Sequence, residues 1–467
     1  MSALVINILA FLVPLILLPI LISVVLFKNN LDLPYHWWLG VLLISLAAIV
    51  FHALQINPAV YSAIITVSIL GFSVWQRQAI RLYVLRVKEF AQNTNYMIVI
   101  MTVIVITIGG LLEITTHPIP LGGDTFSIWL DKTKSIYSGV PYPALPVVEY
   151  PSLGPTFNAF VMRFTGNYKA VYGLFLGPIA YGFWVLSFLS LFNHRSGWIL
   201  PTMLASNAII FFDNYVINGY QDKIVMMCAS MSALAYIQFF NEVSLSHREQ
   251  GARKLQQLFL LGTFFAGMLG LIKSEGTIMG GILLGVGLLI ILITRPKSMA
   301  LSLKNYYVPV IMFIALILLW PLVLFAGKIN LSTIQGNNLS IQSILDVPKN
   351  LGRIYVIWPY YVNYFLGVFP LLLISVFLTI IAFLKASYLR VSLVYLWTVW
   401  FVHLLFILIV FLSTRAPLVW HLDTAFSRLA SQQVFVYPLV VLLVTAFLLD
   451  NTNYNVTYVE SKSIVHL

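Results

Sequence analysis

Four short segments of the chain carry acidic, basic and imidazole side chains at the edges of long apolar runs. They are Gly123-Asp124, Gly219-Tyr220-Gln221-Asp222, Lys273-Ser274-Glu275-Gly276, and Trp420-His421-Leu422 with Arg428. Ionisable groups at the edge of hydrocarbon are costly, so they usually face a wet cavity or one another. Carboxylates and cations beside lipid suit chemistry on an amphipathic, lipid-linked substrate.

The composition indicates which scaffold must position these groups. Of the 467 residues, 60% are hydrophobic and 9% are charged, whereas a soluble domain carries roughly 25% charged residues. Apolar runs of about 20 residues, enough to cross the hydrocarbon core, recur from end to end. The first, Leu4 to Phe27, is too long for the apolar core of a signal peptide, so we interpret it as a retained helix. The sequence therefore predicts an all-α polytopic membrane protein.

The net charge of +11 does not indicate a nucleic-acid partner, because the basic residues are grouped in every second connection between apolar runs. This is the positive-inside pattern of cytoplasmic loops. It predicts about 13 transmembrane helices, with the first residues outside and the C-terminal tail inside. The predicted spans are 3–27, 37–55, 58–76, 96–113, 168–192, 198–212, 219–240, 256–273, 276–294, 306–326, 363–384, 391–413 and 434–449.

The long polar connections begin only after the fourth span, which suggests three parts. Residues 1–95 are predicted to be a three-helix transmembrane extension with a basic cytoplasmic loop. Residues 96–449 are predicted to form the main transmembrane unit, and residues 450–467 a cytoplasmic tail. Within the unit, the extracytoplasmic loop 114–167 has apolar residues at helical spacing, so we predict amphipathic helices there. Lys132 and Lys134 fall off the first apolar stripe and are expected at the surface.

The topology brings the ionisable residues of the four segments to one side of the membrane. If Trp420 to Gln433 is helical, its polar residues form a single stripe. Six residues are expected together at the extracytoplasmic face: Asp124, Asp222, Lys273, Glu275, His421 and Arg428. Topology and motifs are independent observations, and their agreement is the strongest indication of function in the chain.

These segments resemble the bacterial GT-C superfamily of glycosyltransferases, multispanning enzymes that take sugars from polyprenyl-phosphate carriers. The run Gly123 to Trp129, with Lys132, Lys134 and Tyr137 and then Tyr150-Pro151, is similar to the first extracytoplasmic loop of those enzymes. The second and third segments look like the GYAD and KNEG motifs of one bacterial branch. Gln221 stands where alanine is common, and Ser274 where asparagine is common. Trp420-His421-Leu422, followed by Thr424, Arg428 and Gln432, is similar to the branch's C-terminal motif. The resemblance covers about residues 96–449 and does not explain the first three spans.

The resemblance implies an inverting transfer of a sugar from a polyprenyl-phosphate donor to an extracytoplasmic acceptor, for cell-envelope glycan or glycolipid synthesis. The location would be the cytoplasmic membrane of a bacterium. Asp124 would be the catalytic carboxylate, and Lys273, Arg428 and His421 would bind the donor phosphate. Supporting or substrate contacts are expected from Asp222, Glu275, Tyr220, Trp129, Tyr150 and Trp420. No cofactor is expected. A divalent metal held by Asp124 and Asp222 is the alternative.

Structural roles and other functions remain open. Asp124 can be only a helix N-cap, Lys273 with Glu275 only a structural pair, and His421 only a hydrogen-bonded histidine. A lipid-linked sugar flippase or secondary transporter would carry its ionisable residues near the middle of the bilayer, often in repeated halves. A polysaccharide polymerase or ligase would typically place its largest loop late in the chain. Neither pattern is seen in the sequence, which favours the glycosyltransferase. The two other functions are kept as alternatives.

Overall fold

The computed structural model describes residues 3–27, 33–92, 94–116, 125–148, 150–188, 221–245, 252–294, 307–327 and 345–448. Every regular element within these ranges is a helix. Eleven helical stretches among them are long and apolar enough to cross a membrane, and α5 contains a shorter apolar stretch, Val103–Ile114. The chain is therefore an all-α, multi-pass membrane protein, as predicted. The predicted span at 198–212 lies outside the described residues.

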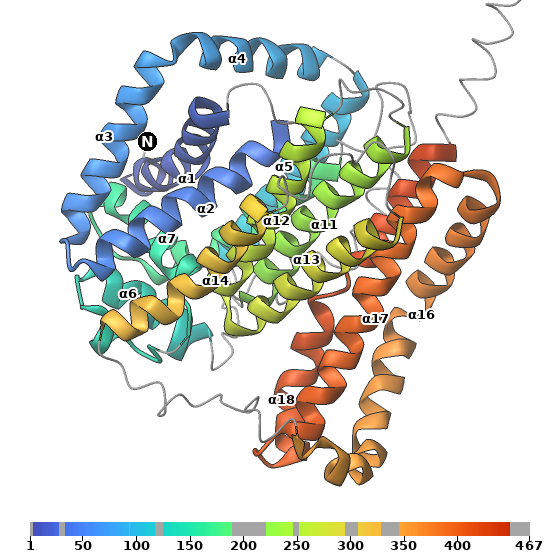
Figure 1. Cartoon of the computed structure of the whole chain (residues 1–467). Helices are drawn as coiled ribbons and strands as arrows, with labels where there is room; N and C mark the ends of the chain where they lie inside the picture. Colours follow the sequence, from blue (N-terminus) through green and yellow to red (C-terminus); the bar gives the residue numbers. More distant parts are fainter. Residues whose placement is uncertain are drawn as a thin grey trace, which may run out of the picture.

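Of the first five helices, the first four lie on one side of the molecule and the fifth lies nearer its centre (Figure 1). They are α1 (Ala3–Phe27), α2 (Leu33–Ala53), α3 (Pro58–Trp75), α4 (Arg77–Gln92) and α5 (Thr94–Thr116). Asn57 begins α3, because its side chain accepts a hydrogen bond from the amide of Ala59 and Pro58 occupies the first turn. The predicted basic loop is the amphipathic helix α4, which runs across one end of the molecule (Figure 1).

Short helices occupy the predicted long loop and the return to the membrane. They are η1 (Thr125–Leu130), α6 (Asp131–Tyr137), η2 (Tyr142–Ala144), α7 (Leu153–Met162), η3 (Arg163–Thr165), α8 (Ala170–Leu174) and α9 (Leu176–Ser187). All ten residues of α7 are buried. This differs from the predicted amphipathic helix with a single apolar face, because α7 packs against both α2 and α6.

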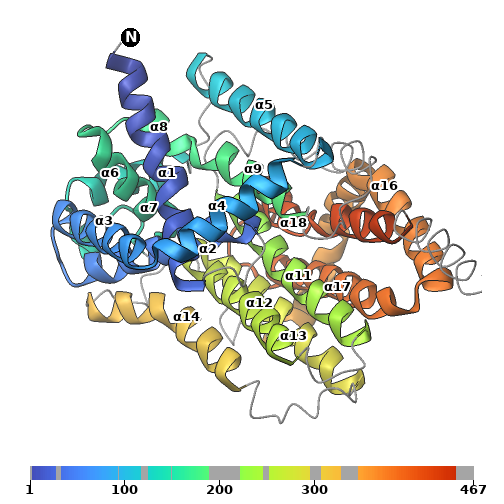
Figure 2. The same ribbon diagram turned by 90° about the horizontal axis from the view of Figure 1, so that it is seen from above.

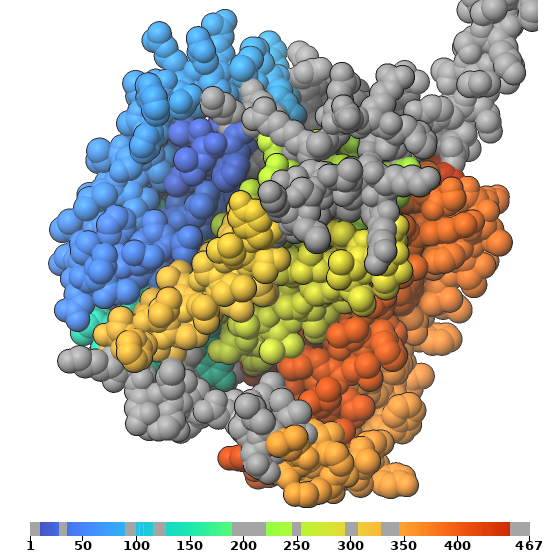
Figure 3. Space-filling view, in the orientation of Figure 1, coloured from blue at the N-terminus to red at the C-terminus, as the bar shows by residue number. Residues whose placement is uncertain are grey.

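The remaining helices are α11 (Gln221–Leu245), α12 (Ala252–Ile272), α13 (Ser274–Thr294), α14 (Tyr307–Ala326), η10 (Val347–Arg353), α16 (Ile354–Lys385), η11 (Ser387–Leu389), α17 (Arg390–Ser413) and α18 (Leu418–Ser431). Residues 436–448 are again helical. Figures 1 and 2 show α11, α12 and α13 in the centre, with α1 to α3 on one side and α16 to α18 on the other. Figure 3 shows the same division on the surface.

Helices α12 and α13 form a close hairpin because α13 presents glycine to its partner. Gly276 and Gly280 are four residues apart and therefore lie on one face of the helix. A Cβ atom at Gly280 would lie 2.1 Å from the carbonyl oxygen of Ala266, and one at Gly276 would lie 2.3 Å from that of Leu269. Small residues at four-residue spacing let transmembrane helices approach closely, so this pair fixes the two helices at their sharp connection.

Two apolar clusters hold the bundle together. The larger one joins residues of α1 and α2 to residues of α11, α12 and α13. The smaller one, which includes Tyr361, Phe411 and Phe426, joins α16, α17 and α18. Helix α16 begins at Ile354, nine residues before the predicted span. At 1.5 Å per residue its 32 residues extend about 48 Å, more than the roughly 30 Å hydrocarbon core.

Candidate functional site

A buried carboxylate, Asp222, lies in the first turn of α11 and receives three hydrogen bonds. Lys273 Nζ donates to its Oδ1 at 2.7 Å, and Gln432 Nε2 donates to the same oxygen at 2.9 Å. Arg428 Nε donates to Oδ2 at 3.3 Å. The Asp222 side chain is 2% exposed, so these three donors take the place of water around the charge. The four residues, with Glu275, are called the Asp222 cluster below.

The break between α12 and α13 places Lys273 and Glu275 in this cluster. Lys273 is the single residue between the two helices, and its amide still bonds to the carbonyl of Leu269 as the last turn of α12 would require. Lys273 Nζ lies 3.7 Å from Glu275 Oε1. The acidic side chain stands in the first turn of α13, where the helix dipole favours it. The Lys273-Ser274-Glu275-Gly276 segment is thus a helix junction that presents one cation and one carboxylate.

Arg428 and Gln432 reach Asp222 because the predicted amphipathic helix forms. Helix α18 (Leu418–Ser431) buries Leu422, Phe426 and Leu429 on one face. Gln432 follows as its C-terminal cap with helical backbone angles, so it stays in line with Arg428 one turn earlier. The residues that pair with Asp222 are therefore 206 and 210 positions away in the chain.

His421 and Trp420, near the start of α18, have different surroundings. His421 is partly buried, and its Nδ1 lies 2.7 Å from Thr414 Oγ1. It lies near the charged groups of Glu275 and Arg428. Trp420 is 60% exposed. The structure thus brings His421 to the edge of the Asp222 cluster, whereas the Trp420 side chain points away from the protein interior.

The outer-loop segments approach the Asp222 cluster through Gly154. A Cβ atom at Gly154 would lie 2.4 Å from Gln221 Oε1, so the glycine lets the end of the Gln221 side chain lie against the backbone there. The rings of Trp129 and Tyr150 meet edge to face with centroids 6.0 Å apart. This contact lies on the stretch of chain that leads into α7. Trp129 is buried and Tyr150 is partly buried.

The loop is held by a lysine that the sequence analysis placed at the surface. Lys132 is fully buried, which corrects that expectation. Its Nζ donates to the carbonyl oxygens of Val147 at 2.8 Å and Tyr150 at 2.7 Å. The ammonium thus ties α6 to the turn before α7. Hydrophobic periodicity missed this role because a lysine stem packs like an apolar chain while its ammonium reaches carbonyl groups.

Replacing Lys132 with methionine is expected to loosen the loop, because two buried carbonyls lose their donor, each at a cost of about 1–3 kcal/mol. Limited proteolysis of the purified protein should then cut residues 139–152 faster than in the wild type. Lys134→Met is the matched control, since Lys134 is exposed in the same helix and the change of charge is identical. Equal cleavage of the two variants would contradict this role for Lys132.

A buried tyrosine also stabilises the loop. The Tyr142 hydroxyl lies 3.2 Å from Ser152 Oγ, and its ring meets those of His52 in α2 and Trp320 in α14 edge to face. Burial raises the pKa of Tyr142 to about 12, although the hydrogen bond with Ser152 favours the ionised form. The phenol is therefore protonated at neutral pH and serves as a fixed hydrogen-bonding group, not as a base.

Two predicted site residues, Asp124 and Tyr220, lie outside the described residues. The metal alternative therefore rests on a residue whose position is not described. Among the described residues, no three His, Cys, Asp or Glu side chains lie close enough to hold a metal ion.

A second polar group, which the sequence analysis missed, lies beside the Asp222 cluster. His403 in α17 is fully buried, and its Nδ1 lies 3.1 Å from Gln433 Oε1. Gln433 Nε2 in turn donates to the hydroxyl of Tyr364 at 3.3 Å. An ionisable residue in the middle of an apolar span is itself an indication of a functional or structural polar contact. The position of His403 within the predicted span 391–413 could therefore have indicated this polar group from the sequence alone.

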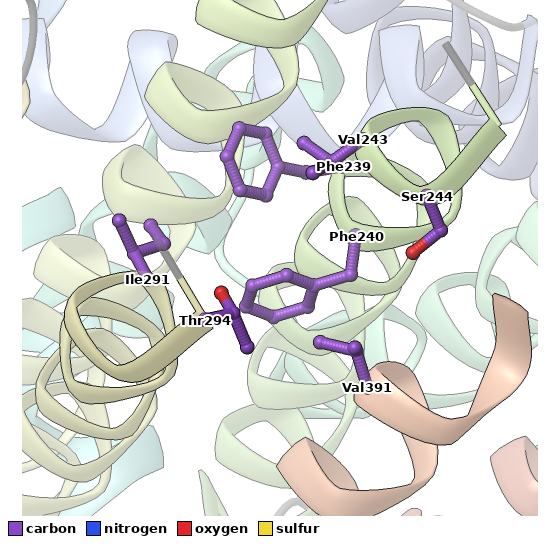
Figure 4. A pocket seen from close by; sticks show the side chains of 7 residues that line it. All are labelled: Phe239, Phe240, Val243, Ser244, Ile291, Thr294 and Val391. Atoms are coloured by element: carbon purple, nitrogen blue, oxygen red, sulfur yellow. The ribbon is translucent and has the colours of Figure 1, made fainter. Parts of the chain in front are cut away.

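A cavity of about 130 Å³ lies toward the other end of α11, between α11, α13 and α17 (Figure 4). Its lining includes Phe239, Phe240, Ile291 and Val391, with the hydroxyls of Ser244 and Thr294. The cavity lies roughly 25 Å along α11 from Asp222. None of its lining side chains is ionisable, so it offers no acid, base or cation for the chemistry expected of the Asp222 cluster.

Comparison with known proteins gave no relative: no family model, no curated protein and no solved structure matches the chain. The resemblance to GT-C enzymes therefore rests on the four motifs alone. What the structure adds is independent of that resemblance, because three separated polar segments meet at one buried carboxylate.

Proposed function

We propose that the protein is an inverting glycosyltransferase that moves a sugar from a polyprenyl-phosphate donor to an extracytoplasmic acceptor. The observation that supports it is the convergence of Asp222, Lys273, Glu275 and Arg428, from three distant segments, at the ends of apolar helices. Ionisable groups beside hydrocarbon that pair with one another mark functional sites in membrane proteins. A lipid-linked donor delivers its phosphate and sugar to that same zone.

The chemistry divides among the residues as follows. Asp124 accepts the proton of the acceptor hydroxyl, as the motif resemblance implies. Arg428, 18% exposed at the rim of the cluster, stabilises the phosphate that leaves, and His421 beside it supports that charge. Asp222 orients Lys273, Arg428 and Gln432 and does not reach the acceptor itself, since its own oxygens are occupied by those three donors. Trp129, Tyr150, Tyr220 and Trp420 contact the substrates.

The proposed setting is the cytoplasmic membrane of a bacterium, with the Asp222 cluster at the extracytoplasmic face. The placement follows from the basic connections that the positive-inside pattern assigns to the cytoplasm. Helix α4, whose Arg77, Arg81 and Lys88 are exposed, and the α16–α17 junction with Lys385 and Arg390 would then lie on the cytoplasmic side.

The test is a transfer assay on the purified protein in detergent, with a panel of polyprenyl-phosphate sugars and with release of free polyprenyl phosphate as the readout. We expect the wild type to release polyprenyl phosphate from at least one donor and Asp124→Asn to lose this activity. Asp131→Asn is the matched control, because Asp131 is exposed in α6 and loses the same charge.

Three results would contradict parts of the proposal. If Asp124→Asn released polyprenyl phosphate as fast as the wild type, the catalytic base would be a residue other than Asp124. Donor binding without release by the wild type, with every donor and with added membrane extract as a source of acceptors, would favour a flippase. Growth of a glycan chain on the carrier, in place of single-sugar transfer, would favour a polymerase.

A further inference from the structure

The hydrogen-bonding groups of the Asp222 cluster are not all satisfied, and those left over are of one kind. The donors Lys273 Nζ, Gln432 Nε2 and Arg428 Nε all point to Asp222. In contrast, Gln432 Oε1 and Glu275 Oε2 are buried oxygen atoms with no hydrogen-bond partner. Gln221 Oε1, beside Asp222 in the chain, is a third such atom.

The orientation of Gln432 is fixed by its neighbour. Its amide nitrogen lies 2.9 Å from a carboxylate oxygen, and turning the amide over would place oxygen against oxygen. Gln432 Oε1 must therefore face away from Asp222, and the side chain is fully buried. An unsatisfied buried acceptor is unfavourable, so a ligand that supplies donors at this place binds more tightly.

The charges of the cluster also limit which kind of ligand can bind there. Asp222 and Glu275 carry two negative charges, and Lys273 and Arg428 carry two positive ones. Among these four described residues the charges cancel, so they leave no excess positive charge to attract an anion. A phosphate placed against the free oxygens would meet the carboxylate of Glu275 and an amide oxygen, which repel it. A group rich in hydroxyls offers the donors that these oxygens lack.

We propose that two buried oxygens of the Asp222 cluster, Gln432 Oε1 and Glu275 Oε2, form a sugar-binding subsite, in which they accept hydrogen bonds from ring hydroxyls. The phosphate is bound beside Arg428 and His421. This assignment rests on the proposed function and changes one expected role: Lys273 holds Asp222 and Glu275 and does not bind the phosphate.

The test measures binding, not transfer, so that it is independent of catalysis. Two probes with the same prenyl chain are used, polyprenyl phosphate and polyprenyl-phosphate glucose, titrated into wild type and Glu275→Gln in detergent with EDTA present. Glu275→Gln exchanges one carboxylate oxygen for an amide nitrogen of equal size. It is expected to weaken binding of the glucose-bearing lipid about tenfold and to leave binding of polyprenyl phosphate unchanged. Retained binding of that second probe also shows that the variant is folded.

Asp423→Asn is the matched control. Asp423 is exposed on α18, where Tyr360 donates a hydrogen bond to it, and its loss removes one negative charge at the same end of the molecule. It is expected to change neither affinity. Methyl glucoside, added in excess, should compete with the glucose-bearing lipid and not with polyprenyl phosphate.

The results that overturn the subsite are distinct from those that overturn the function. Equal changes for the two lipids in Glu275→Gln, or tighter binding of both, would place the phosphate at the two free oxygens. A sugar-dependent loss seen only when Mg²⁺ replaces EDTA would assign the free oxygens to a cation. Failure of the wild type to bind either lipid would instead reject the polyprenyl-phosphate donor itself.

Discussion

Replacing Lys273 with methionine is expected to lower the free energy of unfolding by about 3–5 kcal/mol, the usual cost of leaving a buried charge without its partner. The Lys273 and Asp222 side chains are each 2% exposed, so water cannot replace the lost ammonium. Arg428 and Gln432 still face Asp222, but Arg428 approaches only to 3.3 Å and is itself partly exposed. Methionine preserves the volume of the lysine stem, so the loss of stability measures the effect of the missing charge and not that of a cavity.

The measurement is thermal unfolding of the purified protein in one detergent, followed by intrinsic tryptophan fluorescence. Lys254→Met, in the first turn of α12, is the control, because Lys254 pairs with Glu242 at an exposed site, and such surface pairs contribute about 0–1 kcal/mol. The double variant Lys273→Met with Asp222→Leu should recover stability, since it removes both charges. Equal stability of Lys273→Met and Lys254→Met would contradict the buried pair.

The second large effect concerns the α12–α13 hairpin, where Gly280→Ala is expected to destabilise the protein by about 1–3 kcal/mol. The new methyl group would stand 2.1 Å from a carbonyl oxygen of Ala266, a backbone atom that moves only if the whole helix moves. Pushing α13 outward would also shift the junction that carries Lys273 and Glu275. We therefore expect donor binding to weaken along with stability.

Gly281→Ala provides a stringent control for this prediction. It lies next in the same helix, and a Cβ atom there would meet nothing within 4 Å. Alanine should even stabilise the helix slightly, by up to about 1 kcal/mol, because glycine is the poorer helix former. The two variants are compared by the same fluorescence melting curves. Similar melting temperatures for Gly280→Ala and Gly281→Ala would show that the two helices are not as close as described.

The sequence was most informative where charge stands out against an apolar background. Asp222, Lys273 and Arg428 were predicted to lie together, and they do, because span ends and basic connections determine which loops share a face. The helix at Trp420 was predicted from its polar stripe and forms as α18. The role of each residue within the Asp222 cluster was less predictable from the sequence, since it depends on which hydrogen bonds the residues make with one another.

Packing, in contrast, could not be predicted from periodicity. The burial of Lys132, the complete burial of α7 and the length of α16 depend on which neighbours cover a helix, and hydrophobic spacing does not contain that information. The contact of Gly154 with Gln221 joins segments 67 positions apart. Only the folded arrangement shows that this glycine admits a neighbouring side chain.

The distance along the chain between the members of the Asp222 cluster has a consequence for biogenesis. Asp222 and Lys273 enter the membrane with neighbouring helices and can pair early in synthesis, 51 residues apart. Arg428 and Gln432 are made more than 150 residues later. A nascent protein therefore holds one ammonium shared between two carboxylates, Asp222 and Glu275, and this half-built arrangement is completed only when α18 arrives. Chains that stop before α18 are expected to be recognised and degraded, so assembly of the site and quality control of the protein coincide at its final helices.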